Sequence, residues 1–321
     1  MSIDQYLSTK SPNGQSAIAI GVFDGMHLGH RYLMSRLCEE AQRAGLLSGV
    51  VTFCNHPASV LRPGFNAEYL TSLDERISLV LETGVDFVVP LTFDEQLRLL
   101  TAGDFSRLLK EHLKMSMLVA GKDFVMGRDR EGDTSVLSEI GSQMDFRVLV
   151  VDSVANNCGS TIRSTVIRNA LAAGRVEQAN ESLGRNFALV GTVSRGYGLG
   201  AAMEFPTANL KIHEGLAIPK DGIYAGWAWV GGCRYMAATS IGVRPTFGLK
   251  ERSIEAFILD FDGDLYDKKL RLEFVSRLRD EVKFDSVESL KEQMVKDVND
   301  TRCILRRDRE VKCISNESQI L

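Results

Sequence analysis

Residues 18–30 read IAIGVFDGMHLGH, and this stretch decides the fold because an apolar run ends there in a turn and two histidines. Residues 17–23 have the length and bulk of a buried strand, and Asp24-Gly25 is a turn signal. Apolar residues then recur at helical spacing between positions 33 and 44. The stretch therefore predicts a strand, a turn and the start of a helix.

Two histidines, His27 and His30, fall in the first turn of that helix. Residues three apart on a helix share a face, so both imidazoles can face one ligand. Gly29 between them leaves room for the ligand to approach the backbone. The free N–H groups of a helix N-terminus favour phosphate, and the imidazoles add donors for charge that develops on phosphorus. A surface histidine pair or half of a metal site is the alternative interpretation.

The composition is that of a globular chain: 321 residues, 44% hydrophobic and 25% charged, a length that suggests two domains. The formal charge of −4 gives no basic field, so a nucleic-acid partner is not expected. The 6 cysteines form no CxxC pair, which favours reduced thiols in the cytoplasm. The polar N-terminus and the lack of a long apolar run predict no signal peptide, no membrane segment and no membrane partner. We expect small-molecule partners and a monomer or weak homo-oligomer.

Strands and helices alternate in the first part of the chain. Strands are expected at residues 46–53, 87–91, 117–120 and 146–151, and helices at 71–83, 93–113, 164–173 and 176–183. Such alternation predicts an α/β domain with a doubly wound parallel sheet. His56 follows the second strand, at the sheet edge where such folds bind ligands, although a histidine before a proline is equally suited to cap a turn.

The pattern changes after residue 184. Short strands separated by turn residues are expected at 187–193, 223–230, 236–241, 254–261 and 270–274, followed by a helix at 287–307. These features predict a smaller antiparallel β-barrel with a C-terminal helix. The expected organisation is one domain over residues 1–184, a second over 185–307, and a polar, frayed tail over 308–321.

The segment GVFDGMHLGH resembles the HxGH signature of nucleotidyltransferases. Its longer form, GxFDGxHxGH, resembles the bacterial bifunctional riboflavin kinase/FMN adenylyltransferases, also called prokaryotic FAD synthetases. The resemblance implies that His27 and His30 are catalytic in adenylyl transfer. It further implies nucleotide or flavin binding at Gly21, Phe23, Asp24 and Gly29, while His56 stays a binding candidate from its position at the sheet edge alone.

Two further segments of the first domain resemble this family. GKDFVMG, at residues 121–127, resembles GxDFxFG, which implies that Asp123, Phe124 and Gly127 lie at the nucleotide and flavin sites, with Met126 where an aromatic residue is usual. Methionine can still pack against an aromatic ring.

The second of these segments, IRSTVIR at residues 162–168, resembles ISSTxIR and implies ATP phosphate binding by Ser164, Thr165 and Arg168. Arg163 replaces the usual first serine. Hydroxyls at a helix start can also serve as ordinary N-caps, whereas the guanidinium of Arg168 can bind phosphate oxygens in a bidentate manner.

The second domain carries FPTANL at residues 205–210, which resembles the riboflavin kinase motif. The resemblance implies a nucleotide-binding Pro206, and Thr207 and Asn209 at a magnesium ion; by chemistry alone this segment is also consistent with a simple turn. Glu255 stands where the family carries its catalytic glutamate, suited to take a proton from the riboflavin 5′-hydroxyl. A solvent-facing strand glutamate is the alternative. Phe257 stands where a histidine is common.

The loop before FPTANL departs from the family pattern. The family pattern GxGRGRxLGFPTAN here reads GYGLGAAMEFPTAN, which keeps Gly196 and Gly198 as nucleotide-binding candidates but replaces both arginines, at Leu199 and Ala201. Glu204 replaces a glycine, and an acid near ATP phosphates is repulsive.

We interpret the chain as a bifunctional enzyme that phosphorylates riboflavin to FMN and adenylylates FMN to FAD, with ATP as co-substrate and Mg²⁺ as cofactor. No P-loop or GxGxxG fingerprint is present. One alternative is a monofunctional FMN adenylyltransferase whose barrel is a flavin-binding or regulatory module. Another is a nucleotidyltransferase for a different phosphorylated substrate.

Overall fold

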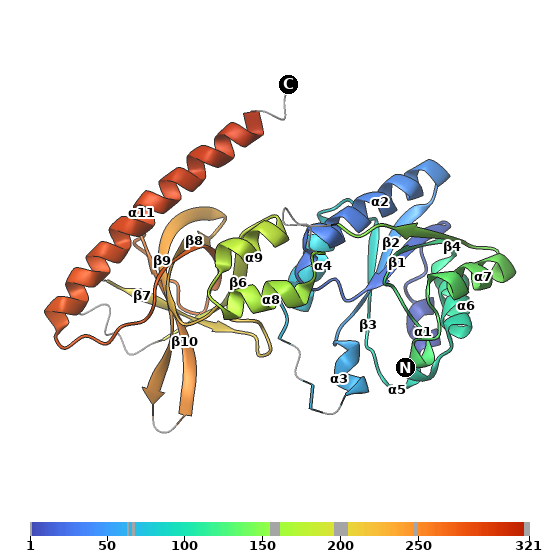
Figure 1. Ribbon diagram of the computed structural model, residues 1–321, viewed down its shortest axis with the longest axis horizontal. Coiled ribbons are helices and arrows are strands. Elements are labelled where there is room, and N and C mark those ends of the chain that lie inside the picture. The colour runs from blue at the N-terminus through green and yellow to red at the C-terminus, as the bar shows by residue number, and fades with distance from the viewer. Residues whose placement is uncertain are drawn as a thin grey trace. The chain divides into compact units, whose positions relative to one another are not determined.

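The computed structural model describes residues 2–62, 64–65, 68–154, 161–195, 205–246 and 249–317. The chain forms two compact units, Met1–Ser164 and Thr165–Leu321. Figure 1 shows the first as a sheet covered by helices and the second as a barrel followed by a long helix.

The first unit contains a five-stranded parallel sheet in the order β3-β2-β1-β4-β5. The strands are β1 (Ser16–Gly21), β2 (Leu47–Phe53), β3 (Phe87–Leu91), β4 (Met115–Gly121) and β5 (Arg147–Val151). The chain winds from β1 outward through β2 to β3 and then returns to β4 on the other side of β1. The switch point of the sheet therefore lies at the carboxyl ends of β1 and β4, where open α/β sheets bind their ligands. The expected doubly wound parallel sheet is confirmed.

Helices cover both faces of this sheet. They are α1 (Ile3–Ser8), α2 (Leu28–Ala44), α3 (Pro57–Leu61), α4 (Leu73–Leu81), α5 (Glu95–Leu99), α6 (Ala102–Leu113) and α7 (Thr134–Met144). Successive side chains of a strand point to opposite faces. Accordingly, Ile18 packs in the core beneath α1, α6 and α7, whereas Ala17 and Ala19 pack in the core beneath α2 and α4.

The helix expected over residues 93–113 is wrong as a single element, because the structure has two helices there. The break falls at Leu100, whose backbone is extended, and the Thr101 hydroxyl then accepts a hydrogen bond from the backbone N–H of Asp104 at 3.0 Å. Helix α7 was not expected, although Asp133 caps it by accepting from the backbone of Ser135 at 2.9 Å. In both places the N-cap signal was present in the sequence.

The second unit is a closed barrel in the order β10-β7-β6-β11-β8-β9, with antiparallel pairing throughout the described ladders. Its strands are β6 (Phe187–Ser194), β7 (Thr207–Ile212), β8 (Gly222–Val230), β9 (Cys233–Thr246), β10 (Leu249–Ile258) and β11 (Lys269–Arg279). The expected barrel is confirmed, but β7 was not among the expected strands. Closure needs β7, because it joins β6 to β10 and leaves no exposed edge there.

Within the described residues, the barrel unit contains the helices α8 (Ser164–Ala172), α9 (Val176–Leu183) and α11 (Val287–Glu317). Asn180 ties α9 to the barrel, since its amide donates to the Phe274 carbonyl at 2.8 Å and accepts from the Phe187 N–H at 2.7 Å. Helix α11 runs past the expected end at residue 307, because no glycine or proline lies between there and Glu317 to stop it. Among the described helices, none is both long and apolar enough to cross a membrane.

Candidate active sites

A strained turn connects β1 to α2. Phe23 has φ 50° and Met26 has φ 38°, so two non-glycine residues adopt the left-handed conformation on either side of Gly25 at φ 77°. Each such residue costs on the order of 1 kcal/mol or more, so neighbouring interactions must hold the turn in place.

Asp24 supplies those interactions. Its side chain is 2% exposed, and it accepts hydrogen bonds from the backbone N–H of Leu70 at 2.9 Å and of Thr71 at 3.2 Å. The Thr71 hydroxyl in turn accepts from the N–H of Gly25 at 3.2 Å. The carboxylate is thus engaged within the protein and fixes the turn; contact between Asp24 and a bound nucleotide stays a prediction.

The two imidazoles follow this turn directly. His27 is the N-cap of α2, and its Nδ1 accepts a hydrogen bond from the backbone N–H of His30 at 3.3 Å. The two rings stack, with centroids 3.6 Å apart and an angle of 18° between their planes. A ring whose Nδ1 accepts a hydrogen bond carries its proton on Nε2, so His27 presents an N–H donor on its other edge.

His30 is held in its neutral form. Burial is the main cause that places its pKa well below the ordinary value, and His27 and the cation of Arg76 lower this pKa further. Its Nδ1 is buried and has no hydrogen-bond partner among the described residues. The rings of His30 and Phe23 pack in a T-shaped arrangement, with their centroids 5.3 Å apart.

Two glycines give these rings their space. A Cβ atom on Gly21 would lie 2.9 Å from the Phe23 ring, and one on Gly29 would lie 3.2 Å from Nδ1 of His27. Gly29 therefore leaves room for the imidazole, and its expected role of admitting a ligand to the backbone stays a prediction.

A pocket of about 310 Å³ lies at the carboxyl ends of the strands. It is lined by His27, Gly29, His30, Leu33, Gly121, Lys122, Asp123, Phe124, Val151, Asp152, Ser153, Val154, Thr161, Ile162, Arg163 and Ser164. Its size is in the range of small-molecule sites. The structure thus brings both histidines together with three candidates from distant segments, Asp123, Phe124 and Ser164.

Ser164 is tied to the histidine turn, because its hydroxyl donates to the Asp24 carbonyl at 3.0 Å. Thr165 and Arg168 follow it on α8, but they fall in the second unit and do not line the pocket. Their expected role toward ATP phosphates stays a prediction.

Three other residues of the first unit have structural partners. His56 is the N-cap of α3 and accepts from the Ala58 N–H at 3.1 Å, which is the capping alternative, and it does not line the pocket. Gly127 has φ 82°, and a Cβ there would lie 2.6 Å from the backbone of Ala102. Met126 is buried in the core beneath α6 and α7 and does not line the pocket, so the expected packing against a ligand's ring is not supported.

The sequence analysis missed Arg76. This side chain on α4 is 1% exposed and donates from Nη1 to the carbonyls of Val22 at 3.0 Å and Phe53 at 2.8 Å. It thereby joins the chain ends of β1 and β2 beneath the histidine turn. Burial lowers the pKa of Arg76, while the nearby Asp24 favours its charged form.

The barrel unit brings together the candidates of the second site. Glu255 on β10 lies opposite Asn209 on β7, and the Thr207 hydroxyl donates to Oε2 of Glu255 at 3.2 Å. Successive side chains of a strand point to opposite faces of the sheet, so Thr207 and Asn209 share one face. Glu255 shares this face because it pairs with Asn209 across the strands. Pro206 is exposed just before β7. Phe257 packs edge to face on Phe205, with ring centroids 5.1 Å apart.

A further carboxylate, Glu281, was also missed. It lies against β9, where a Cβ atom on Gly242 would come within 2.0 Å of its Oε1. Burial is the first cause that raises the pKa of Glu281, and the carboxylates of Asp221 and Glu255 raise it further. Glu281 therefore belongs to the surroundings of Glu255.

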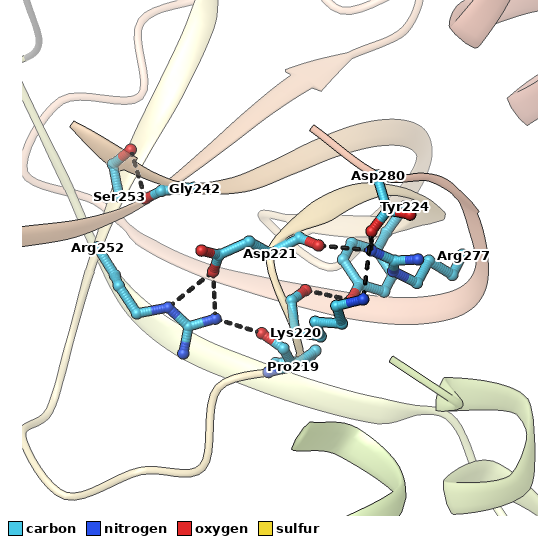
Figure 2. Close-up of polar contacts among 9 residues, drawn as sticks. All are labelled: Pro219, Lys220, Asp221, Tyr224, Gly242, Arg252, Ser253, Arg277 and Asp280. Atoms are coloured by element: carbon cyan, nitrogen blue, oxygen red, sulfur yellow. Dashed lines mark hydrogen bonds and ion pairs between the residues drawn. The ribbon is translucent and has the colours of Figure 1, made fainter. Parts of the chain in front are cut away.

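A network of ion pairs fixes the segment that leads into β8 (Figure 2). Arg252 on β10 donates from Nε to Oδ1 of Asp221 at 2.9 Å, and Arg277 on β11 donates to the Asp221 carbonyl at 2.6 Å. Arg277 also pairs with Asp280 at 2.7 Å, and the Tyr224 hydroxyl donates to the Lys220 carbonyl. These contacts tie Asp221, just before β8, to β10 and β11.

The glycine-rich loop of the second domain lies outside the described residues. This applies to the candidates Gly196 and Gly198 and to the departures at Leu199, Ala201 and Glu204.

Two family models match the chain in succession: FAD synthetase over residues 9–166 and riboflavin kinase over residues 183–305. A bifunctional riboflavin kinase/FMN adenylyltransferase from Pseudomonas fluorescens is 35% identical, covering 95% of this chain and 98% of its own length. The proteins of the same name from Listeria monocytogenes and Escherichia coli K12 are 34% and 33% identical, each covering 90% of this chain and 92% of its own length.

A solved structure agrees over both units. The crystal structure described as a macrolide-efflux protein from Streptococcus pneumoniae matches with a TM-score of 0.85 at 31% identity, covering 91% of this chain and 95% of that one. The two family models and the full-length relatives give one consistent result. The chain belongs to the bifunctional riboflavin kinase/FMN adenylyltransferase family.

Proposed function

We infer that this chain carries out two ATP-dependent reactions: it phosphorylates riboflavin to FMN and adenylylates FMN to FAD, with release of pyrophosphate. The observation that carries this conclusion is the order of the two family matches, since FAD synthetase and riboflavin kinase each match one part of the chain. A monofunctional adenylyltransferase with a regulatory barrel is not favoured, because the barrel itself matches riboflavin kinase.

A single assay tests both activities. Purified protein incubated with riboflavin, ATP and Mg²⁺ should yield FMN and then FAD, separated by chromatography. With FMN in place of riboflavin, FAD should form directly. If the protein makes FAD from FMN but makes no FMN from riboflavin, the adenylyltransferase activity stands and the kinase activity is excluded.

The pocket of the first unit supports adenylyl transfer to the FMN phosphate. An oxygen of that phosphate attacks the α-phosphorus of ATP, the bond to the β-phosphate breaks, and pyrophosphate leaves. We assign to the Nε2–H group of His27 and to the neutral imidazole of His30 the role of stabilising the charge that develops on the phosphoryl oxygens. Preorganised donors and positioning are sufficient for such a transfer without a covalent enzyme intermediate.

The barrel site supports phosphoryl transfer to riboflavin. We assign Glu255 as the base that accepts the proton of the riboflavin 5′-hydroxyl, and the 3.2 Å hydrogen bond from Thr207 orients its carboxylate. Thr207 and Asn209 present neutral oxygen atoms beside a carboxylate, a set that suits Mg²⁺. A bound Mg²⁺ would neutralise the charge of the ATP phosphates.

Three properties stay predictions. They are a functional domain limit near residue 184, a cytoplasmic location, and a monomeric or weakly associated state. Free thiols at the described cysteines Cys38, Cys54, Cys233 and Cys303 support the expected location.

A further inference from the structure

Arg163 is the residue at which this chain departs from the ISSTxIR pattern, and it lines the pocket beside the histidines. Among the lining residues, Lys122 and Arg163 are the two that carry a full positive charge. Both are paired with acids of the same rim: Lys122 with Asp152 at 2.6 Å, and Arg163 with Asp123 at 2.9 Å. The rim therefore holds two cations, each paired with a carboxylate of the same rim.

The pair between Arg163 and Asp123 is easily exchanged. The side chains are 63% and 74% exposed, and ion pairs at such exposure contribute little to stability because solvent screens them. A phosphate group carries more negative charge than a carboxylate and offers three acceptor oxygens. It therefore competes well for the planar fork of an arginine.

The backbone of Arg163 is fixed while its side chain is free to turn. Ile162 is 6% exposed, and its N–H donates to the Val154 carbonyl at 3.3 Å. Ser164, on the other side, donates to the Asp24 carbonyl of the histidine turn at 3.0 Å. Arg163 is thus anchored to the same turn that positions His27, and its guanidinium can leave Asp123 without movement of the main chain.

We propose that Arg163 is a phosphate-binding residue of the adenylyl site, which exchanges Asp123 for a phosphate group of a bound substrate. The proposal rests on the adenylyltransferase function proposed above. Both substrates of that reaction carry phosphate, ATP as a triphosphate and FMN as a monoester. The bound phosphate gains a charge-assisted, bidentate contact that a serine at this position cannot make.

The first test compares steady-state kinetics of FAD formation from FMN in four proteins: unmodified, Arg163→Ser, Arg163→Lys and Arg107→Ser. Arg163→Ser should lower kcat/KM about ten- to a hundred-fold, the scale of one hydrogen bond to a charged group, and Arg163→Lys should fall in between. Arg107→Ser is the matched control, because Arg107 is 57% exposed and paired with Asp104 at 2.8 Å outside the pocket lining. Circular dichroism and the denaturant midpoint of each preparation, compared with the unmodified protein, report that the first unit is folded.

The second test separates direct phosphate binding from a merely structural ion pair. Arg163→Ser is measured again in an Asp123→Asn background, which has already lost the pair. If Arg163 binds phosphate, the serine variant weakens the reaction in both backgrounds. If Arg163 acts only through Asp123, the second change has no further effect and the proposal is overturned.

The third test identifies which phosphate is bound. If Arg163 binds the ATP polyphosphate, Arg163→Ser raises the KM for ATP and the inhibition constant of pyrophosphate. If Arg163 binds FMN, the same change raises the KM for FMN alone. No change in any of these constants overturns the proposal. If the unmodified protein makes no FAD, the proposed function fails separately, and calorimetric titration of pyrophosphate into the unmodified and Arg163→Ser proteins still decides the role of Arg163.

Discussion

At the scale of single residues, the stacked imidazoles of His27 and His30 are the groups in the first unit that we expect to act in catalysis. His27→Ala or His30→Ala should lower FAD formation from FMN about a hundredfold or more, the scale for losing one preorganised donor. Riboflavin phosphorylation in the same samples should be retained. His112→Ala is the control, since His112 pairs with Asp4 at 2.7 Å and does not line the pocket. Unchanged FAD formation in both pocket variants would show that the catalytic site lies elsewhere.

The lowered pKa of His30 also makes a prediction about stability. Its pKa in the folded state lies below the value of about 6.5 in the unfolded chain, so below that pH the unfolded state binds more protons. The contribution of His30 to the free energy of unfolding is therefore fully present above about pH 6.5. As the pH falls below that value, the free energy of unfolding decreases by up to about 1.4 kcal/mol per pH unit. Urea unfolding at about pH 7.5 and about pH 5.5 should show a smaller loss in His30→Gln than in the unmodified protein. An equal loss in both proteins would contradict this account.

The assignment of Glu255 has an equally direct test. Glu255→Gln keeps the size of the side chain and removes its basicity, so riboflavin phosphorylation should fall about a hundred- to ten-thousand-fold. FAD formation from supplied FMN should not change, because Glu255 lies in the barrel unit and the adenylyl pocket is lined by the first unit. A kinase rate within a few-fold of the unmodified protein would remove Glu255 as the base.

At the scale of secondary-structure elements, Arg76 links β1, β2 and α4. Arg76→Leu would leave the carbonyls of Val22 and Phe53 without the donor they have now. Each unsatisfied buried carbonyl costs about 1 to 3 kcal/mol, so the first unit should lose about 2 kcal/mol or more in its free energy of unfolding. Denaturant titration measures this loss. Arg98→Leu, which removes an exposed pair with Glu95, should have little effect.

Local sequence signals were enough for some of these elements and not for others. The strand, turn and helix around the histidines could be predicted, because hydrophobic spacing and the Asp24-Gly25 turn are local. The break at Leu100 and the helix after Asp133 depend on N-caps whose side chains also suit loops. Strand β7 was missed because it is defined by pairing with β6 and β10, and the local sequence PTAN does not indicate this pairing.

The candidate sites divide in the same way. The pocket places His27 and His30 beside Asp123, Phe124 and Ser164, a combination that the resemblance to the family implied. By contrast, Gly127, Met126 and His56 proved to have packing or capping partners, which only the tertiary structure supplies. Arg76 did leave one signal: it shares helical spacing with the buried residues Leu79 and Val80, which places a charge on an apolar face.

At the scale of the whole molecule, α8 and α9 decide how the chain can be divided. The hydrogen bonds of Asn180 join α9 to the barrel, and the Lys220 N–H donates to the Leu171 carbonyl of α8 at 2.9 Å. The resemblance assigns Thr165 and Arg168 of α8 to the ATP phosphates of the adenylyl reaction. Residues 165–184 therefore belong to the barrel unit, and a requirement for Thr165 and Arg168 in adenylyl transfer stays a prediction.

Overlapping fragments test this expectation. A fragment of residues 1–184 should make FAD from FMN, whereas 1–164 should not, since it lacks Thr165 and Arg168. A fragment of residues 165–321 should phosphorylate riboflavin and unfold at a higher temperature than 185–321, because removal of α9 exposes the barrel surface that it covers and takes away the two hydrogen bonds of Asn180. Circular dichroism shows first that each fragment is folded. FAD formation by a folded 1–164 fragment at the full rate would exclude α8 from the adenylyl reaction.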